Sequence, residues 1–216
     1  GAGALGIYNR AFTLMTLPIR QSLTPLTNVF LPMLSRIKDE KERYFRALLK
    51  VQFALGSIVV FGYAMAVALS PEIVYVVLGD QWLDSAPIFS LLAIGGVFQL
   101  FSHLNYWVFL SQGVTSSLLA YNLITKTLTV AVIIGASFHS IEAVATAYAI
   151  SLAVSWPINV YWLKRVVTLP ASVFLANGLS ILVAGAISYL AVTVLRSVLP
   201  GAWILIAVPP AAVIYF

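Results

Sequence analysis

The sequence predicts an all-α, polytopic membrane helix bundle, and its composition, its few charges and its long apolar segments each indicate this fold class. Of the 216 residues, 61% are hydrophobic and 9% are charged, whereas a soluble domain is about half apolar and about a quarter charged. The 12 basic and 7 acidic residues are too few to cover a soluble protein of this size, and such a composition also excludes disorder. The apolar segments reach the roughly 20 residues that a helix needs to cross a bilayer.

We expect a single transmembrane domain over residues 1–216. Its apolar segments predict six full spans at 9–36, 43–69, 85–110, 116–138, 141–163 and 171–198, and a truncated seventh span from residue 202. Residues 1–8 should precede the first span on the outer side. Because both ends interrupt apolar sequence and no initiator Met is present, we expect a piece of a longer protein.

Two connections carry local signals of helix ends. Ser70-Pro71-Glu72 has the pattern of a helix start, with a cap, a proline in the first turn and an acid. The 70–84 connection should therefore hold a short interfacial helix that ends near Gly79. Ser140 should cap the fifth span, since a serine oxygen can accept a bond from an unpaired amide of the first turn.

Basic residues predict the orientation of the spans. Six of them flank or lie in the 37–42 connection, and Lys164 and Arg165 follow the fifth span. Short cytoplasmic loops are enriched in Lys and Arg, so both connections are expected to be cytoplasmic. The acidic 70–84 connection should then be external. Because topology accounts for the net charge of +5, we expect no nucleic acid partner.

The first span carries a polar stripe. Its polar residues fall within an arc of about 100° on a helix, and apolar residues occupy the opposite face. An arginine at mid-span costs at least ~2.5 kcal/mol on insertion scales, so the stripe predicts a water-filled cavity or a bound anion. Arg10 could instead reach the outer interface, but Arg20 lies roughly 15 Å deeper. The candidate substrate-binding residues here are Arg10, Arg20, Gln21, Thr24 and Asn28, and the opposite face carries Phe12, Ile19, Leu23 and Phe30.

The predicted spans contain three further patterns, two of polar residues and one of prolines. Asn122 and Lys126 share a face of the fourth span, and we favour Lys126 as a second cavity cation over one paired with a neighbouring helix. Gln99, Ser102, His103 and Tyr106 share a face of the third span, where we expect His103 to be a hydrogen-bonded packing residue. Pro18, Pro25 and Pro32 recur every seven residues. Each removes a backbone donor, which fits a gating helix and a statically kinked helix equally.

No residue pattern indicates catalysis or a cofactor. The chain has no cysteine and two distant histidines, so we expect no metal site and no thiol nucleophile. The predicted intramembrane charges are three cations without a deep acid. A cation pathway usually needs an intramembrane carboxylate, so this charge pattern favours an anionic substrate such as a phosphate.

The first 110 residues resemble the polysaccharide-repeat flippases (Wzx type), which belong to the multidrug/oligosaccharidyl-lipid/polysaccharide exporter superfamily. The order and spacing of several short segments carry the resemblance. These segments are Gly3-Ala4-Leu5-Gly6-Ile7-Tyr8-Asn9-Arg10-Ala11, Leu17-Pro18-Ile19-Arg20-Gln21, Phe30-Leu31-Pro32-Met33-Leu34-Ser35-Arg36, Phe45-Arg46, Leu78-Gly79-Asp80-Gln81-Trp82 and Ala86-Pro87-Ile88.

The resemblance implies a two-lobe transporter, of which this chain would be most of the C-terminal lobe. Such proteins move undecaprenyl-pyrophosphate-linked oligosaccharides across the bacterial inner membrane by alternating access, without acting as enzymes. The expected partners are the lipid-linked oligosaccharide, the bilayer and the missing N-terminal lobe. Two alternatives stay open: a cation-coupled drug antiporter of the same superfamily, and a membrane-embedded sugar polymerase or glycosyltransferase.

Overall fold

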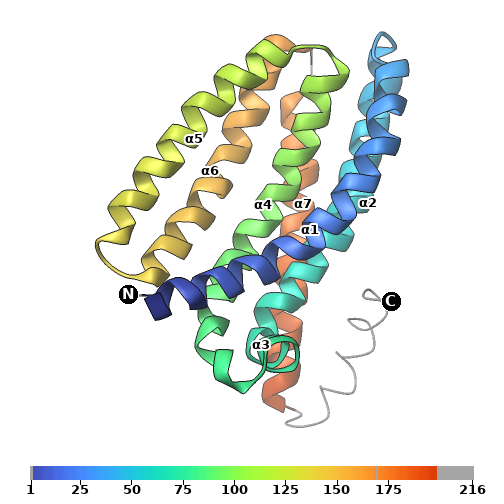
Figure 1. Ribbon diagram of the computed structural model, residues 1–216. Helices are drawn as coiled ribbons and strands as arrows, with labels where there is room; N and C mark the ends of the chain where they lie inside the picture. Colours follow the sequence, from blue (N-terminus) through green and yellow to red (C-terminus); the bar gives the residue numbers. More distant parts are fainter. Residues whose placement is uncertain (1, 169, 199–216) are drawn as a thin grey trace.

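The computed structural model describes residues 2–168 and 170–198, and every regular element in this part of the chain is helical (Figure 1). This confirms the all-α fold class. The elements are α1 (Ala2–Arg36), α2 (Lys41–Ala68), α3 (Ser70–Leu78), the 3₁₀ helix η1 (Asp80–Ser85), α4 (Ala86–Ser111), α5 (Thr115–Ser137), α6 (Ile141–Val166) and α7 (Ala171–Val198).

Five helices of the described part are long and apolar enough to cross a membrane: α2, η1 with α4, α5, α6 and α7. They coincide with five of the six predicted full spans to within a few residues. The sixth is α1, which has 35 residues but is less apolar because of its polar stripe. The predicted seventh span, from residue 202, lies outside the described residues.

The first helix begins earlier than we expected. The first helix was predicted to begin near residue 9, but α1 begins at Ala2; that residues 2–8 precede the membrane span stays a prediction. Isolated glycines such as Gly3 and Gly6 cost a helix only about 1 kcal/mol each, and Ile7 and Tyr8 pack against the hydrophobic core. The short helix predicted in the 70–84 connection is present as α3, and Gly79 follows its last residue with a φ of 94°; its interfacial position stays a prediction.

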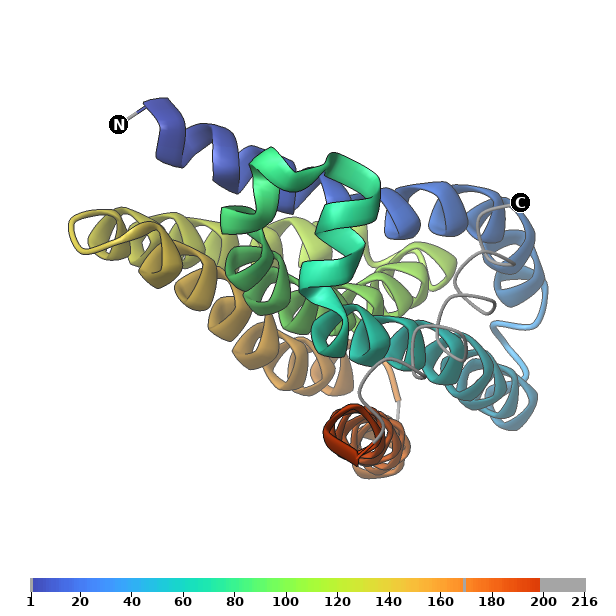
Figure 2. The same cartoon turned by 90° about the horizontal axis from the view of Figure 1, so that it is seen from below.

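Helix α4 lies at the centre of the bundle (Figures 1 and 2). In its most apolar stretch 61% of residues are buried, against 6% in α5. Helices α1, α2 and α6 pack around α4, while α5 packs mainly on α6 and α7 mainly on α2. Figure 2 shows α1 and α7 on opposite sides of the bundle. Most of the large outward residues of α5 are apolar, as expected of a lipid-facing helix, and Lys126 is an exception.

Close backbone packing joins the central helices. A methyl group added to Gly96 of α4 would lie 2.6 Å from the Tyr63 ring of α2. The Tyr63 hydroxyl in turn donates a hydrogen bond of 2.6 Å to the backbone carbonyl of Met15 in α1. Small residues at such crossings let membrane helices approach closely. The Gly96–Tyr63 contact and the Tyr63–Met15 hydrogen bond therefore hold α1 and α2 against α4.

Candidate functional site

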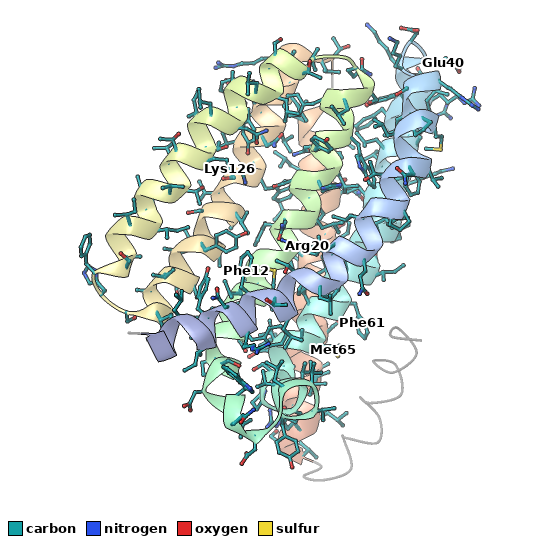
Figure 3. The ribbon with its side chains drawn as sticks, viewed as in Figure 1. Phe12, Arg20, Glu40, Phe61, Met65 and Lys126 are labelled. Atoms are coloured by element: carbon teal, nitrogen blue, oxygen red, sulfur yellow. The ribbon has the colours of Figure 1, made fainter. Side chains whose placement is uncertain are left out.

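A groove runs between α1 and α4, and we call it the central groove. Its volume is about 380 Å³, and Ile19, Arg20, Leu23, Thr27 and Asn28 of α1 line it together with Gln99, His103 and Tyr106 of α4. Figure 3 shows Arg20 where α1 passes in front of α4. Arg20 is exposed and lines the groove.

The wall of the groove is held by hydrogen bonds around Thr27. Its hydroxyl lies 2.7 Å from the Leu23 carbonyl, 2.9 Å from the Trp107 indole nitrogen and 3.3 Å from His103 Nε2. A hydroxyl has one proton, the carbonyl only accepts and the indole N–H only donates. The shorter bond assigns the hydroxyl proton to Leu23, so His103 donates from Nε2 and its Nδ1 remains an acceptor. His103 is therefore hydrogen-bonded in the wall.

Gln99 contributes an unsatisfied acceptor to the same groove. Its side-chain Oε1 is buried and has no hydrogen-bond partner in the described part of the chain. An unpaired buried acceptor costs about 1–3 kcal/mol, and a hydroxyl group of water or of a ligand would satisfy it. The central groove thus offers a cation for an anionic group and, beside it, an acceptor for an O–H group.

The polar stripe of α1 is divided between two places. Arg20 and Asn28 line the central groove, whereas the Arg10 guanidinium lies 5.0 Å from the ring centre of Trp82 in η1. This cation–π contact holds Arg10 at the end of the bundle that carries α3. Gln21 is exposed but does not line the groove. The side chain of Thr24 lies outside the described residues.

Two apolar residues of α1 lie beside Arg20 of the polar stripe, and not on the opposite face. Ile19 and Leu23 were predicted on the face opposite Arg20, but both line the central groove beside it. The groove therefore faces the edge of the stripe, where polar and apolar residues meet.

Lys126 and Asn122 lie apart from the central groove. Both are on α5, where Lys126 is exposed and Asn122 half-buried. Figure 3 shows Lys126 on this outer helix, away from Arg20, and neither residue lines the groove. The two cations therefore do not share one pocket in this conformation.

The three prolines leave α1 continuous. Pro18, Pro25 and Pro32 all lie inside the helix, and each is exposed. Figure 1 shows that α1 changes direction along its length, as expected where backbone donors are missing. Gating by these prolines stays a prediction.

Sequence reasoning did not propose Gln99, His103 and Tyr106 as site residues. They recur at i, i+4 and i+7 on α4, which places them on one helix face. This spacing was the available signal, but it does not reveal that the face is turned toward Arg20. In the described part of the chain no group of three His, Cys, Asp or Glu residues could hold a metal ion.

The fold and the groove define a multi-pass, all-helical membrane protein with a cation in a polar groove between two of its helices. Residues 1–87 match a family of polysaccharide biosynthesis proteins. This segment includes all of α1, and with it the α1 wall of the central groove.

Two curated relatives extend the comparison. The teichuronic acid biosynthesis protein TuaB of Bacillus subtilis (strain 168) is 30% identical over 113 residues, which cover 52% of this chain and 23% of TuaB. An uncharacterized membrane protein in the cps region of Klebsiella pneumoniae is 32% identical over 103 residues, covering 46% of this chain and 21% of that protein. The matches thus span less than a quarter of either relative. No solved structure matches.

These matches confirm the resemblance to membrane proteins of polysaccharide biosynthesis. The family match covers residues 1–87, within the first 110 residues that carry the quoted segments.

Proposed function

We propose that the chain is part of a flippase that moves undecaprenyl-pyrophosphate-linked oligosaccharides across the bacterial inner membrane by alternating access. The observation that carries the proposal is Arg20 in the central groove, with Asn28, Gln99 and His103 around it. A guanidinium can form charge-assisted, bidentate bonds to a phosphate or carboxylate. The neighbouring amides and imidazole could then bind the hydroxyl groups of a sugar.

The distribution of acids supports an anionic substrate. All seven acidic residues lie in connections, in η1 or in the first turns of helices: Asp39, Glu40, Glu42, Glu72, Asp80, Asp84 and Glu142. A cation-coupled drug antiporter would need an intramembrane carboxylate from another part of the protein. The short connections between these helices also favour transport over an enzymatic role as polymerase or glycosyltransferase.

The proposal also includes the orientation of the chain in the membrane and a second set of helices as its partner. The α1–α2 and α6–α7 connections would face the cytoplasm, because they carry the basic residues. A second set of helices from the same protein would close the substrate pathway opposite α1. Figure 2 shows α1 on one side of the bundle, where such a lobe could meet it.

The proposal is tested by glycan export in bacteria whose own copy of the protein is replaced by variants. A charge-assisted contact is worth roughly 1.5–3 kcal/mol, so Arg20→Ala should reduce substrate binding by about tenfold to a hundredfold. Export should fall while the protein still accumulates in the membrane. Arg20→Lys should retain part of the export, because it keeps the charge without the planar fork.

The matched control is Arg46→Ala, which removes an exposed arginine whose ion pair with Glu42 spans 4.0 Å at the surface. Export should be unchanged in this variant. Normal export by Arg20→Ala at a normal protein level would refute the assignment of Arg20 to the substrate site.

A further inference from the structure

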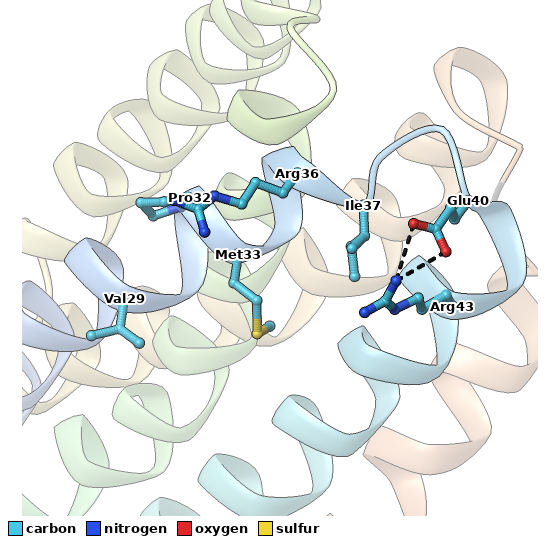
Figure 4. A pocket seen from close by; sticks show the side chains of 7 residues that line it. All are labelled: Val29, Pro32, Met33, Arg36, Ile37, Glu40 and Arg43. Carbon is cyan, nitrogen blue, oxygen red and sulfur yellow. Dashed lines mark hydrogen bonds and ion pairs between the residues drawn. The ribbon is translucent and has the colours of Figure 1, made fainter.

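A second groove lies where α1 ends and α2 begins, and we call it the α1–α2 groove. It has a volume of about 570 Å³ and is lined by Val29, Pro32, Met33, Arg36, Ile37, Glu40 and Arg43. Figure 4 shows the Met33 and Ile37 side chains between Arg36 on one side and the Glu40–Arg43 pair on the other. The groove thus combines an apolar floor with a basic rim.

This groove is separate from the central groove. At 100° per residue, the centre of Val29, Met33 and Arg36 lies roughly 110° around α1 from the centre of Ile19, Leu23 and Thr27, so the two sets face different directions. The two grooves share no residue. A ligand of the α1–α2 groove therefore need not be the ligand of the central groove.

The charges at the rim favour an anion. Arg43 donates to both carboxylate oxygens of Glu40 at 3.1 and 3.2 Å, so these two charges compensate each other. Arg36 is exposed and forms no ion pair with any described residue. Lys38 and Lys41, which follow it closely, are exposed as well. Residues 36–46 hold five basic and three acidic side chains, the acids being Asp39, Glu40 and Glu42, so the net charge at this end of the groove is positive.

The position of the groove at the end of α1 suits the boundary of a bilayer. Arg36 is the last residue of α1, and charged residues of the connection follow it, so we expect it at the level of lipid headgroups. Figure 4 shows its side chain extending along α1 beside Pro32, above the apolar floor. Val29 is 64% exposed, which leaves the floor accessible to an acyl chain.

We propose that the α1–α2 groove binds an anionic phospholipid of the bilayer, with the phosphate at Arg36 and an acyl chain along Val29, Met33 and Ile37. Basic pockets at helix ends bind anionic headgroups in this way. The groove faces a different direction from the central groove and shares no lining residue with it, which favours a bilayer lipid over the transported one. The proposal does not depend on flippase activity.

Residues 1–216 contain no cysteine, so a cysteine introduced at Val29 is the single labelling site in this part of the protein. The variant Val29→Cys is labelled with a bimane fluorophore and reconstituted into phosphatidylcholine vesicles containing a small fraction of lipid with brominated acyl chains. Brominated phosphatidylglycerol should quench the fluorophore at about fivefold lower mole fraction than brominated phosphatidylcholine, which corresponds to about 1 kcal/mol for one basic residue at the membrane surface. Adding Arg36→Gln should abolish this preference.

The control adds Arg46→Gln, which removes an exposed arginine of the same end that does not line the groove, and the preference should persist. Equal quenching by the two lipids, or an undiminished preference in Arg36→Gln, would overturn the proposal. Displacement by a polyprenyl diphosphate at far lower concentration than by phosphatidylglycerol would also overturn it, and would assign the groove to a transported lipid.

Discussion

The guanidinium of Arg196, in the last turn of α7, donates a hydrogen bond of 2.6 Å to the Glu72 carboxylate at the start of α3. Arg196 also donates to the backbone carbonyl of Ala68 at 3.3 Å. The bond joins the end of α7 to the connection between α2 and α4. It also places Arg196 and the acidic 70–84 connection at the same end of the bundle, as the alternation of spans predicts.

Loss of this ion pair should destabilise the protein. The pair is partly exposed, with 40% and 29% of the two side chains accessible, so we expect Arg196→Ala to cost about 1 kcal/mol. For a chain of this size that lowers the melting temperature by about 2–4 °C, measured by thermal unfolding in detergent. The exposed pair Arg46–Glu42, at 4.0 Å, supplies the control, and Arg46→Ala should leave the melting temperature unchanged.

Removing the Thr27 hydroxyl should destabilise the protein even when the volume of the side chain is kept. Thr27→Val keeps the volume but removes the acceptor for Trp107 and His103, so the buried indole N–H and the half-buried imidazole lose their partner. We expect a destabilisation of about 1–3 kcal/mol, measured in the same unfolding assay. Thr127→Val is the matched control, because Thr127 on α5 is exposed and its hydroxyl donates only to its own helix at Leu123. Equal effects of the two substitutions would contradict the role of Thr27.

Close packing at Gly96 gives a further prediction. Its added methyl group would lie 2.6 Å from the Tyr63 ring, and Tyr63 is buried at 5% exposure. Gly96→Ala should therefore reduce the amount of folded protein in the membrane. Gly62→Ala should be neutral or stabilising, because nothing lies within 4 Å of the added group and alanine favours a helix. The measurement is the monodisperse fraction after detergent extraction.

The predicted orientation can be measured by labelling single cysteines. Lys41→Cys and Lys164→Cys should react only from the cytoplasmic side, and Asp80→Cys and Ser140→Cys only with an external, membrane-impermeant reagent. All four positions are exposed, so burial does not confound the result. Reaction of Lys41→Cys from outside would overturn the positive-inside assignment of the whole chain.

The sequence predicted the helices well because hydropathy and local end signals determine them. Ser140 caps α6 as expected, accepting a hydrogen bond of 3.0 Å from the Ala143 amide. Gly79 ends α3 with a positive φ. The start of the helix was placed too late, because Gly3 and Gly6 are poor helix formers while the helix there is stabilised by packing of Ile7 and Tyr8 on the core.

The site was only partly predictable. A helical wheel finds the face that carries Arg20, but it does not identify the helix on which that face packs. Arg10, predicted with Arg20, instead contacts Trp82 in η1, a residue 72 positions away in sequence. Gln99 and His103 complete the groove from α4, and their role depends on a helix crossing that no local pattern encodes.

The most direct test of the central claim is photo-crosslinking of the transported lipid from the central groove. Tyr106 lines this groove at its rim and is 36% exposed. Its replacement by p-benzoylphenylalanine should capture the diphosphate-linked oligosaccharide on illumination, and Arg20→Ala in the same protein should remove most of that product. The same replacement at Leu123, exposed on α5, should capture bilayer lipid alone. Capture at Tyr106 that is undiminished by Arg20→Ala, or equal capture at Leu123, would contradict a substrate site at Arg20.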